Sequence, residues 1–343
     1  MKKEVTARLA LGPMSTEVIE AVYRYSEENE TQLMLIASKA QIDWDGGYVN
    51  NWTTNQYVEH INQLSKGYAK ADVLLCRDHC GPGFKNTQNV LDHYITVDTD
   101  LEAGFDLIHV DFCHWNGGEH QAKLEQTCRL IQHIQDNDTD MMFEIGTDEN
   151  VGTTEIDLER IETDIDFFLS YFNPEFYVVE TGSLIKEVNQ VGTFKPDRVK
   201  ETCELLHSRG LKLKEHNADY LSKDDLKLRQ GAVDAVNIAP MLGVLQTNFV
   251  LHQAMRHGFD TTPFLNKAYE SERWKKWLYK NDANNKYLCA LTAGHYVFSS
   301  DEYLSLVDRL DQVELDIRGD IINEHYHVID HYMHGLGEFK CLM

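Results

Sequence analysis

Short hydrophobic runs recur along the chain, and each is followed by a polar or glycine-containing turn and then by a segment with helical periodicity. The runs are too short for helices and have the length of buried strands. Eight can be counted, at residues 6–11, 33–37, 73–76, 107–110, 141–145, 176–179, 211–214 and 232–238. The first is the weakest, because Leu9 to Pro13 could also form a loop. The pattern predicts eight strand-then-helix units.

The segments between the runs have the spacing and the end signals of amphipathic helices. Ser15 precedes one of them and has a side chain suited to capping a helix N-terminus. Gly210 follows another, which ends with a basic last turn, and suits a helix C-terminus. The clearest helical segments are residues 15–28, 54–68, 119–135, 156–172 and 195–209.

Parallel neighbouring strands need crossovers, which helices usually provide. The number of units and their strict alternation favour a closed (β/α)8 TIM barrel over an open doubly wound sheet. From about residue 250 onward the alternation stops, and residues 301–315 and 321–334 indicate helices. We therefore predict an α/β barrel over residues 1–250 and a C-terminal helical extension over residues 251–343, packed on the barrel.

Composition and charge exclude several classes of partner. Hydrophobic residues make up 42% of the 343 residues and charged residues 26%, as in an ordinary globular protein. The chain has 56 acidic and 32 basic residues, so its formal net charge is −24. This field would repel a nucleic acid or an anionic membrane. The one dense basic cluster, residues 273–277 with Lys280, suits a small anion or a solvated helix face with inward-packing tryptophans.

The chain carries no sign of a membrane or secreted protein. No hydrophobic run approaches the ~20 residues that span a bilayer, and the N-terminal residues lack the long apolar stretch of a signal peptide. Seven cysteines are too few for a disulfide scaffold, and Cys76 falls at an inward position of a strand, where it reads as a core residue. We expect a cytoplasmic protein.

Candidate chemistry gathers at the carboxyl ends of the predicted strands, where TIM barrels place their functional groups. Titratable side chains occur there on five successive strands, and an amide occurs on the eighth. They are Asp78 and His79, His109 and Asp111, Glu144, Glu180, Glu215 with His216, and Asn237. Two histidines and a glutamate can hold a catalytic divalent metal and leave a position open for substrate. We predict His79, Glu180 and His216 as metal ligands.

Several of these segments resemble class II fructose-bisphosphate aldolases. Residues 73–80 (VLLCRDHC) resemble the motif of that family's third strand, residues 143–149 its fifth-strand glutamate segment, and residues 213–216 a later strand that ends in a second zinc histidine. The resemblance implies that Asp78 is the acid/base and His79 a zinc ligand. A histidine that the family places on strand six is Glu180 here, which leaves Zn²⁺ and Mn²⁺ both open.

A closer resemblance, over most of the chain, is to the non-catalytic subunit of class II tagatose-bisphosphate aldolase. It rests on residues 46–48 (GGY), 77–82 (RDHCGP), 105–111 (FDLIHVD), 144–148 (EIGTD), 215–220 (EHNADY) and 238–240 (IAP). The group includes C4 epimerases of ketose phosphates. An epimerase of this kind can break and remake the C3–C4 bond by retro-aldol and aldol steps, so one site would serve both reactions.

The resemblance implies an enzyme that cleaves or epimerises a ketose, expected to be phosphorylated. Asp78 would act as acid/base, and Glu144 and Asp111 would assist it. The phosphate and the sugar would contact Gly182, Ser183, Asn237 and His114, because backbone N–H groups near the strand ends can hold an anion.

Three alternatives stay open from the sequence. The chain could stabilise a separate aldolase subunit as a non-catalytic partner, it could form a homo-oligomer, and it could be a metal-dependent sugar isomerase, since proton transfer between C1 and C2 needs the same groups. The histidine-rich residues 324–334 have metal-compatible helical spacing, but they favour a helix that covers the barrel or a subunit interface.

Overall fold

The structure is a computed structural model, and it describes residues 3–85, 87–146, 152, 156–279 and 284–337. Eight parallel strands form a closed barrel, in the order β1-β2-β3-β4-β5-β6-β9-β10. Their bounds are β1 Leu9–Leu11, β2 Gln32–Ser38, β3 Asp72–Cys80, β4 Leu107–Val110, β5 Met142–Ile145, β6 Phe176–Val179, β9 Lys212–Glu215 and β10 Ala235–Ile238. The predicted (β/α)8 TIM barrel is confirmed, and the first run does form a strand.

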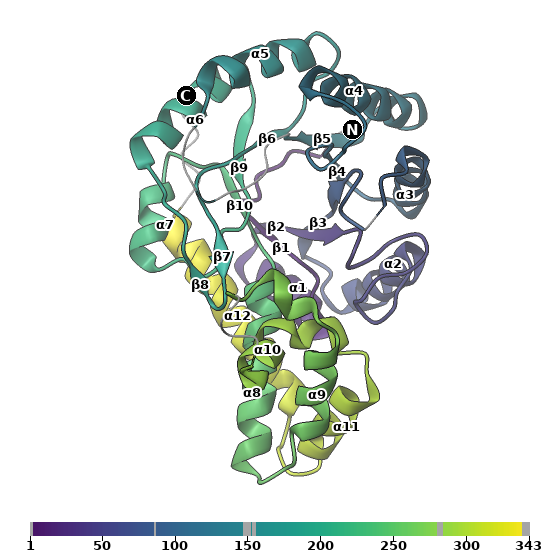
Figure 1. Cartoon of the computed structure of the whole chain (residues 1–343), viewed down its shortest axis with the longest axis vertical. Coiled ribbons are helices and arrows are strands. Elements are labelled where there is room, and N and C mark those ends of the chain that lie inside the picture. Colours follow the sequence, from purple (N-terminus) through teal and green to yellow (C-terminus); the bar gives the residue numbers. More distant parts are fainter. Residues whose placement is uncertain (1–2, 86, 147–151, 153–155, 280–283, 338–343) are drawn as a thin grey trace.

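Helices follow the strands and surround the barrel (Figure 1). They are α1 Thr16–Asn29, α2 Thr54–Leu64, α3 Val90–Ala103, α4 His120–Asn137, α5 Leu158–Leu169, α6 Pro196–Ser208 and α7 Lys223–Arg229. The predicted caps are confirmed, because the Ser15 side chain accepts from the Val18 N–H and Gly210 adopts a φ of 74° just after α6. A short hairpin of β7 (Ile185–Lys186) and β8 (Asn189–Gln190) is inserted between β6 and α6.

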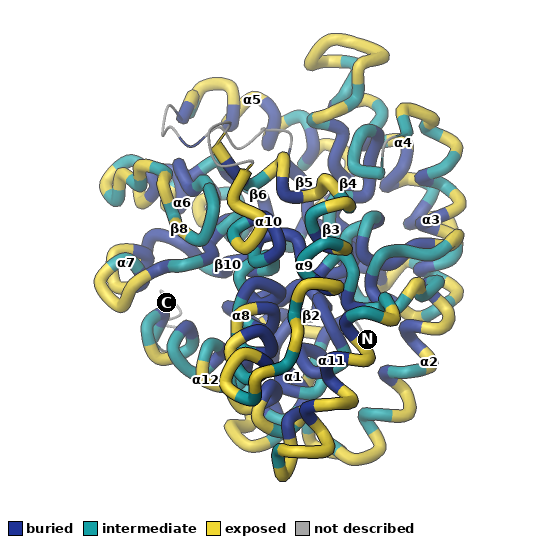
Figure 2. Tube along the Cα trace, turned by 60° about the horizontal axis from the view of Figure 1, so that its bottom comes forward, coloured by how far each residue is buried: buried dark blue, intermediate teal, exposed yellow. Residues whose placement is uncertain are grey.

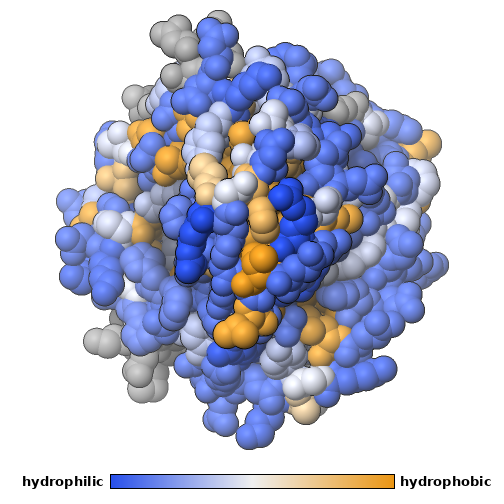
Figure 3. Space-filling view, turned by 90° about the horizontal axis from the view of Figure 1, so that it is seen from below, coloured by the Kyte–Doolittle hydropathy of each residue, from blue (hydrophilic) through white to orange (hydrophobic). Residues whose placement is uncertain are grey.

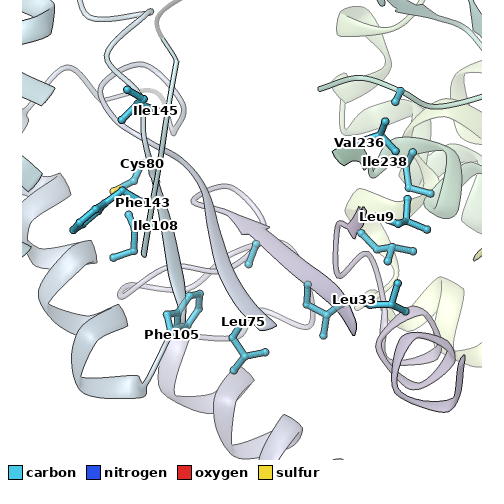
Figure 4. Packing of buried hydrophobic residues seen from close by; sticks show 14 of the residues in the cluster. Leu9, Leu33, Leu75, Cys80, Phe105, Ile108, Phe143, Ile145, Val236 and Ile238 are labelled. Atoms are coloured by element: carbon cyan, nitrogen blue, oxygen red, sulfur yellow. The ribbon is translucent and has the colours of Figure 1, made fainter. Parts of the chain in front are cut away.

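Two hydrophobic layers hold the barrel. Inside it, Met34, Leu74, Cys76 and Phe176 pack together, so Cys76 is the core residue that its position predicted. A larger cluster fills the space between the strands and the helices, and Figure 4 shows part of it. The strands are buried, whereas the exposed residues lie mainly on the outer turns and helix surfaces (Figure 2).

The chain after β10 leaves the barrel and returns to it. Helix α8 (Pro240–Arg256) leads into the extension, which contains α9 (Thr262–Glu270), η2 (Arg273–Lys276), α10 (Lys286–Ala293), η4 (Gly294–Val297) and α11 (Asp301–Asp311) and projects from one side of the barrel (Figure 1). Seen from its end, the extension has a mostly hydrophilic surface with narrow hydrophobic patches (Figure 3). In the described residues, no helix is both long and apolar enough to cross a bilayer.

The last helix, α12 (Ile317–Leu336), closes the ring of barrel helices. It packs against α1 and α7 and so occupies the place of an eighth barrel helix. The Tyr332 hydroxyl donates to the Ala218 carbonyl at 2.6 Å, and His331 Nε2 lies 2.9 Å from the Leu221 carbonyl. The histidine-rich segment thus covers the barrel, as predicted. The boundary near residue 250 stays a prediction, because α8 crosses it.

Candidate metal centre at the mouth of the barrel

Strand β3 ends in an irregular segment that carries Asp78 and His79. Its pairing with β4 shifts register between Arg77 and Cys80, and His79 has a φ of 47°. A non-glycine residue in the left-handed region costs free energy and is common at functional sites. Gly81 follows with its Cα against β4, where an added Cβ would lie 1.4 Å from the Asp111 carbonyl oxygen. The sequence therefore needs glycine here to bring the end of β3 against β4.

Four side chains from three strands meet at the mouth, which is the end of the barrel formed by the carboxyl ends of the strands. They are Asp78, His79, His109 and His216, and one nitrogen or oxygen of each lies within 4.8 Å of those of the others. The three imidazole centroids are 5.0, 5.0 and 5.1 Å apart. This group of three histidines and one carboxylate is the candidate metal centre.

Two further carboxylates fix the orientation of two of these rings. Asp111 Oδ2 lies 2.9 Å from His79 Nδ1, and Glu144 Oε1 lies 2.8 Å from His216 Nε2. Each contact uses one ring nitrogen and leaves the other for the centre, where His216 Nδ1 is 3.9 Å from Asp78 Oδ1. Carboxylates that hold ligating histidines in this way are common around metals.

Lys214 lies below the centre inside the barrel and is fully buried. Its ammonium group contacts the second oxygen of Glu144 and lies 5.2 Å from the centre of the Phe176 ring. A buried charge of this kind is costly unless it is paired. Each of the two charges, on Lys214 and on Glu144, therefore needs the other to be stable in the core. The sequence analysis had assigned Lys214 no role.

The electrostatics of the centre favour ionised carboxylates. Burial opposes the charge on Asp78, yet the neighbouring His79 and the other two imidazoles hold the pKa of that carboxyl far below its usual range. Burial likewise opposes ionisation of Glu144, but Lys214 and His216 lower its pKa to about 2. Burial would lower the pKa of His79, and Asp78 and Asp111 instead raise it to about 8.

The donor set fits a divalent transition metal. Imidazole nitrogens with one carboxylate are ligands that Zn²⁺ and Mn²⁺ accept. Within the described residues, His109 Nε2 and Asp78 Oδ1 are buried and have no hydrogen-bond partner. Orphaned polar atoms in a buried cluster are expensive unless something binds them. A cation at this point would bind the His109 nitrogen and balance the charge of the nearby Asp78 carboxylate.

Glu180, predicted as a ligand, is not a member of this group. It follows β6, and its Oε1 accepts the Gly152 N–H at 3.0 Å. The group contains His109, which the sequence analysis placed on strand four but had not predicted as a ligand.

The predicted substrate contacts are spread around the mouth. Ser183 donates to Glu215, which Arg229 holds with two bonds of 2.7 Å, so Ser183 belongs to a buried ion-pair network. Gly182 precedes it with a φ of 94°. The side-chain amide of Asn237 on β10 is buried and has no hydrogen-bond partner among the described residues.

His114 is joined to the centre through Phe84. The Phe84 ring stacks on His79 with centroids 4.5 Å apart and contacts the exposed His114 ring at 4.7 Å. Residues 147–149 of the strand-five segment lie outside the described residues.

The basic cluster of the extension reaches the mouth. Burial lowers the pKa of Lys276, Asp78 opposes this, and Arg273 and Lys186 add to the lowering. Lys186 of the hairpin also donates to the Lys276 carbonyl at 3.3 Å. Because Asp78 interacts electrostatically with Lys276, and Arg273 and Lys186 act on the same ammonium group, we define Lys186, Arg273 and Lys276 as the cationic rim of the mouth.

Comparison with known proteins identifies the fold. No protein-family model matches the chain. A protein described as a probable tagatose 6 phosphate kinase from Sinorhizobium meliloti 1021 superposes with a TM-score of 0.78 at 15% identity, over 96% of this chain and 100% of its own. Its match includes the helical extension as well as the barrel.

Two aldolases also match. The fructose-bisphosphate aldolase from Campylobacter jejuni has a TM-score of 0.56 at 13% identity, covering 93% of this chain and 91% of its own. A putative fructose-1,6-biphosphate aldolase from Coccidioides immitis has a TM-score of 0.53 at 14% identity, covering 88% and 94%. The chain shares the fold of these aldolases. At such low identity, the likeness concerns the fold alone.

Proposed function

We propose that the chain is a metal-dependent enzyme that cleaves, or epimerises at C4, a phosphorylated ketose by retro-aldol and aldol chemistry. The observation that carries the proposal is the convergence of His79, His109 and His216 with Asp78 at the mouth. The match to solved aldolases supports it, because their barrels have the same architecture. A Zn²⁺ or Mn²⁺ ion held there would polarise the substrate carbonyl and stabilise an enediolate.

In this proposal the ligands are His79, His109 and His216. His109 replaces Glu180 as the third ligand, because Glu180 bonds to the Gly152 N–H and lies outside the group. Asp111 and Glu144 orient two of the rings, and the positive charge of Lys214 keeps Glu144 ionised.

Asp78 is the group that moves the proton. It is ionised at neutral pH, and its Oδ1 has no hydrogen-bond partner among the described residues, so it can accept a proton. In the cleavage direction Asp78 takes the proton of the C4 hydroxyl, the C3–C4 bond breaks, and its electron pair passes to the enediolate. For epimerisation the aldehyde turns its other face, the bond reforms, and Asp78 returns the proton.

The cationic rim would receive the substrate phosphate. Two lysines and an arginine stand near a carboxylate-rich centre in a chain of net charge −24, so they provide a local positive field in an otherwise negative molecule. Such a field would draw the phosphate to the rim and leave the carbon chain pointing toward Asp78.

The test is turnover by the isolated chain, loaded with Zn²⁺ or Mn²⁺, on fructose and tagatose phosphates. We expect triose release or C4 inversion, followed by NMR in deuterated water. Asp78→Asn should abolish it, while the matched surface variant Asp98→Asn should retain it. Deuterium at C1 or C2 without C4 inversion or triose would instead indicate an isomerase, and no turnover with any metal would contradict the proposal.

The ligand assignment has its own measurement. Removing one of three ligands should strongly weaken metal binding, so His109→Ala should lose the metal of the mouth. Glu180→Ala should keep it. If Glu180→Ala loses the metal and His109→Ala keeps it, the sequence-based ligand set is right and the geometric one is wrong.

A further inference from the structure

A second group of metal-compatible side chains lies at the other end of the barrel. Cys203 and His207 lie one turn apart on α6, and Asp234 comes directly before β10. Cys203 Sγ is 3.5 Å from His207 Nε2 and 3.7 Å from Asp234 Oδ2, and His207 Nε2 is 2.9 Å from the same oxygen. The three atoms form a small triangle of sulfur, nitrogen and oxygen.

This triangle is held by the barrel and is separate from the mouth. Asp234 Oδ2 accepts the Leu213 N–H at 2.7 Å, which fixes the carboxylate at the amino ends of β9 and β10. His79, His109 and His216 lie at the carboxyl ends of the strands. Nothing in the proposed reaction uses Cys203, His207 or Asp234.

The dimensions match those of a tetrahedral zinc site. Zinc bonds of about 2.3 Å to sulfur and about 2.0 Å to nitrogen and oxygen place the ligand atoms roughly 3.3–3.6 Å apart. The two distances from the sulfur, 3.5 and 3.7 Å, lie close to that range, whereas the nitrogen and oxygen are 2.9 Å apart and would separate slightly on binding the ion. The charges also match, because a thiolate and a carboxylate with a neutral imidazole balance a divalent cation. The His207 side chain is 36% exposed, so water can reach a fourth position.

We propose that Cys203, His207 and Asp234 bind a structural Zn²⁺ ion, with water as the fourth ligand, that ties the end of α6 to the start of β10. On binding, the Cys203 S–H bond breaks, a Zn–S bond forms, and the proton leaves to solvent without any change of oxidation state. The charged groups that face the triangle, besides Asp234 itself, are Glu204, Lys212 and Arg8.

Cobalt substitution distinguishes this site from the mouth. A thiolate bound to Co²⁺ gives a charge-transfer band in the near ultraviolet, and the mouth group contains no cysteine. The chain stripped of metal and titrated with Co²⁺ should show this band, and so should a His79→Ala/His216→Ala variant that lacks the mouth site. The band should persist in the control Cys128→Ser and vanish in Cys203→Ser. Its absence from the unmodified chain, or its persistence in Cys203→Ser, would overturn the proposal.

Thiol protection provides a readout that does not depend on removing the cysteine. Zn²⁺ should protect Cys203 from alkylation in the unmodified chain. His207→Ala keeps the thiol but loses a ligand, so protection should require on the order of 100-fold more Zn²⁺. Equal protection of both proteins would show that the three side chains form only hydrogen bonds. Circular dichroism of each variant establishes that it is folded.

Discussion

Glu144 Oε1 lies 2.8 Å from Nε2 of His216, and this contact joins the middle of the barrel to its mouth. The same carboxylate contacts the buried ammonium group of Lys214. One side chain therefore has two roles, because it orients a ring of the metal centre and balances a charge in the core. Removing its charge should disturb both.

Glu144→Gln should weaken metal binding and destabilise the protein. Loss of a carboxylate that orients a ligating histidine typically lowers metal affinity about 10- to 100-fold. Lys214 would then be buried without a counter-charge, at a cost of about 3 kcal/mol or more. Competition with a chelator measures the first effect, and urea unfolding of the metal-free chain measures the second. The exposed Glu59→Gln on α2 is the control. If the two variants have the same metal affinity and the same stability, Glu144 does not have these two roles.

Gly81→Ala should disrupt the mouth. The new Cβ would lie 1.4 Å from the Asp111 carbonyl oxygen, which is backbone and cannot turn away, so the end of β3 must shift. We expect a loss of stability of about 1–3 kcal/mol or more and loss of activity, because Asp78 and His79 lie on the shifted segment. Gly67→Ala is the matched control, since an added Cβ there meets no atom within 4 Å. An active, stable Gly81→Ala would show that the segment can relax.

Asp219 should make stability fall as pH rises. Its carboxyl is buried, and burial raises its pKa from 3.8 to about 7 even though it accepts the N–H groups of Ala239 and Met241. Between these two values the folded chain holds a proton that the unfolded chain has released, so the folded state loses stability as pH increases from about 4 to 7. The slope approaches about 1.4 kcal/mol per pH unit.

Asp219→Asn should remove that dependence. The amide oxygen can still accept both N–H groups, and the amide cannot ionise. Urea unfolding at pH 5, 6 and 7 should show that the free energy of unfolding of the variant increases, relative to that of the unmodified chain, as pH rises. The exposed Asp136→Asn is the control, and its stability should have the same pH dependence as that of the unmodified chain. A difference between Asp219→Asn and the unmodified chain that is constant with pH would contradict the ionisation argument.

Lys276→Ala should weaken the binding of a phosphorylated substrate. A charge-assisted contact contributes about 1.5–3 kcal/mol, so KM should rise at least tenfold with a smaller change in kcat. Lys275 is the matched control, because it is a neighbouring lysine of the same cluster that pairs with Glu272 at 2.6 Å. Raising the salt concentration should lessen the difference between the two variants. If both variants have the same KM, the cationic rim does not hold the phosphate.

The strands and much of the mouth could be predicted from local pattern. Eight apolar runs of strand length, separated by helical segments, permit few arrangements other than a barrel, because parallel strands need crossovers. Asp78 and His79 could be located because a strand end in a barrel faces the mouth whatever the rest of the fold does.

His109 could not be identified as a candidate ligand in the same way. It lies within β4, not after it, and only the register that pairs it with Glu144 and the closure of the barrel bring it to His79 and His216. Glu180 directly follows a predicted strand, which is the position expected of a site residue, yet it lies outside the group. Whether a side chain reaches the centre depends on the tilt and stagger of the closed sheet, which no short segment encodes.

The sequence by itself determined the eight strands, five of the helices between them and the strand ends that carry Asp78, His79 and His216, since hydrophobic periodicity acts over a few residues. The tertiary structure alone decided that α12 fills the gap between α1 and α7, that Lys276 of the extension reaches the mouth, and that Cys203 meets Asp234. Those contacts join residues far apart in the chain, and they form only when the closed barrel and its packed helices bring them together.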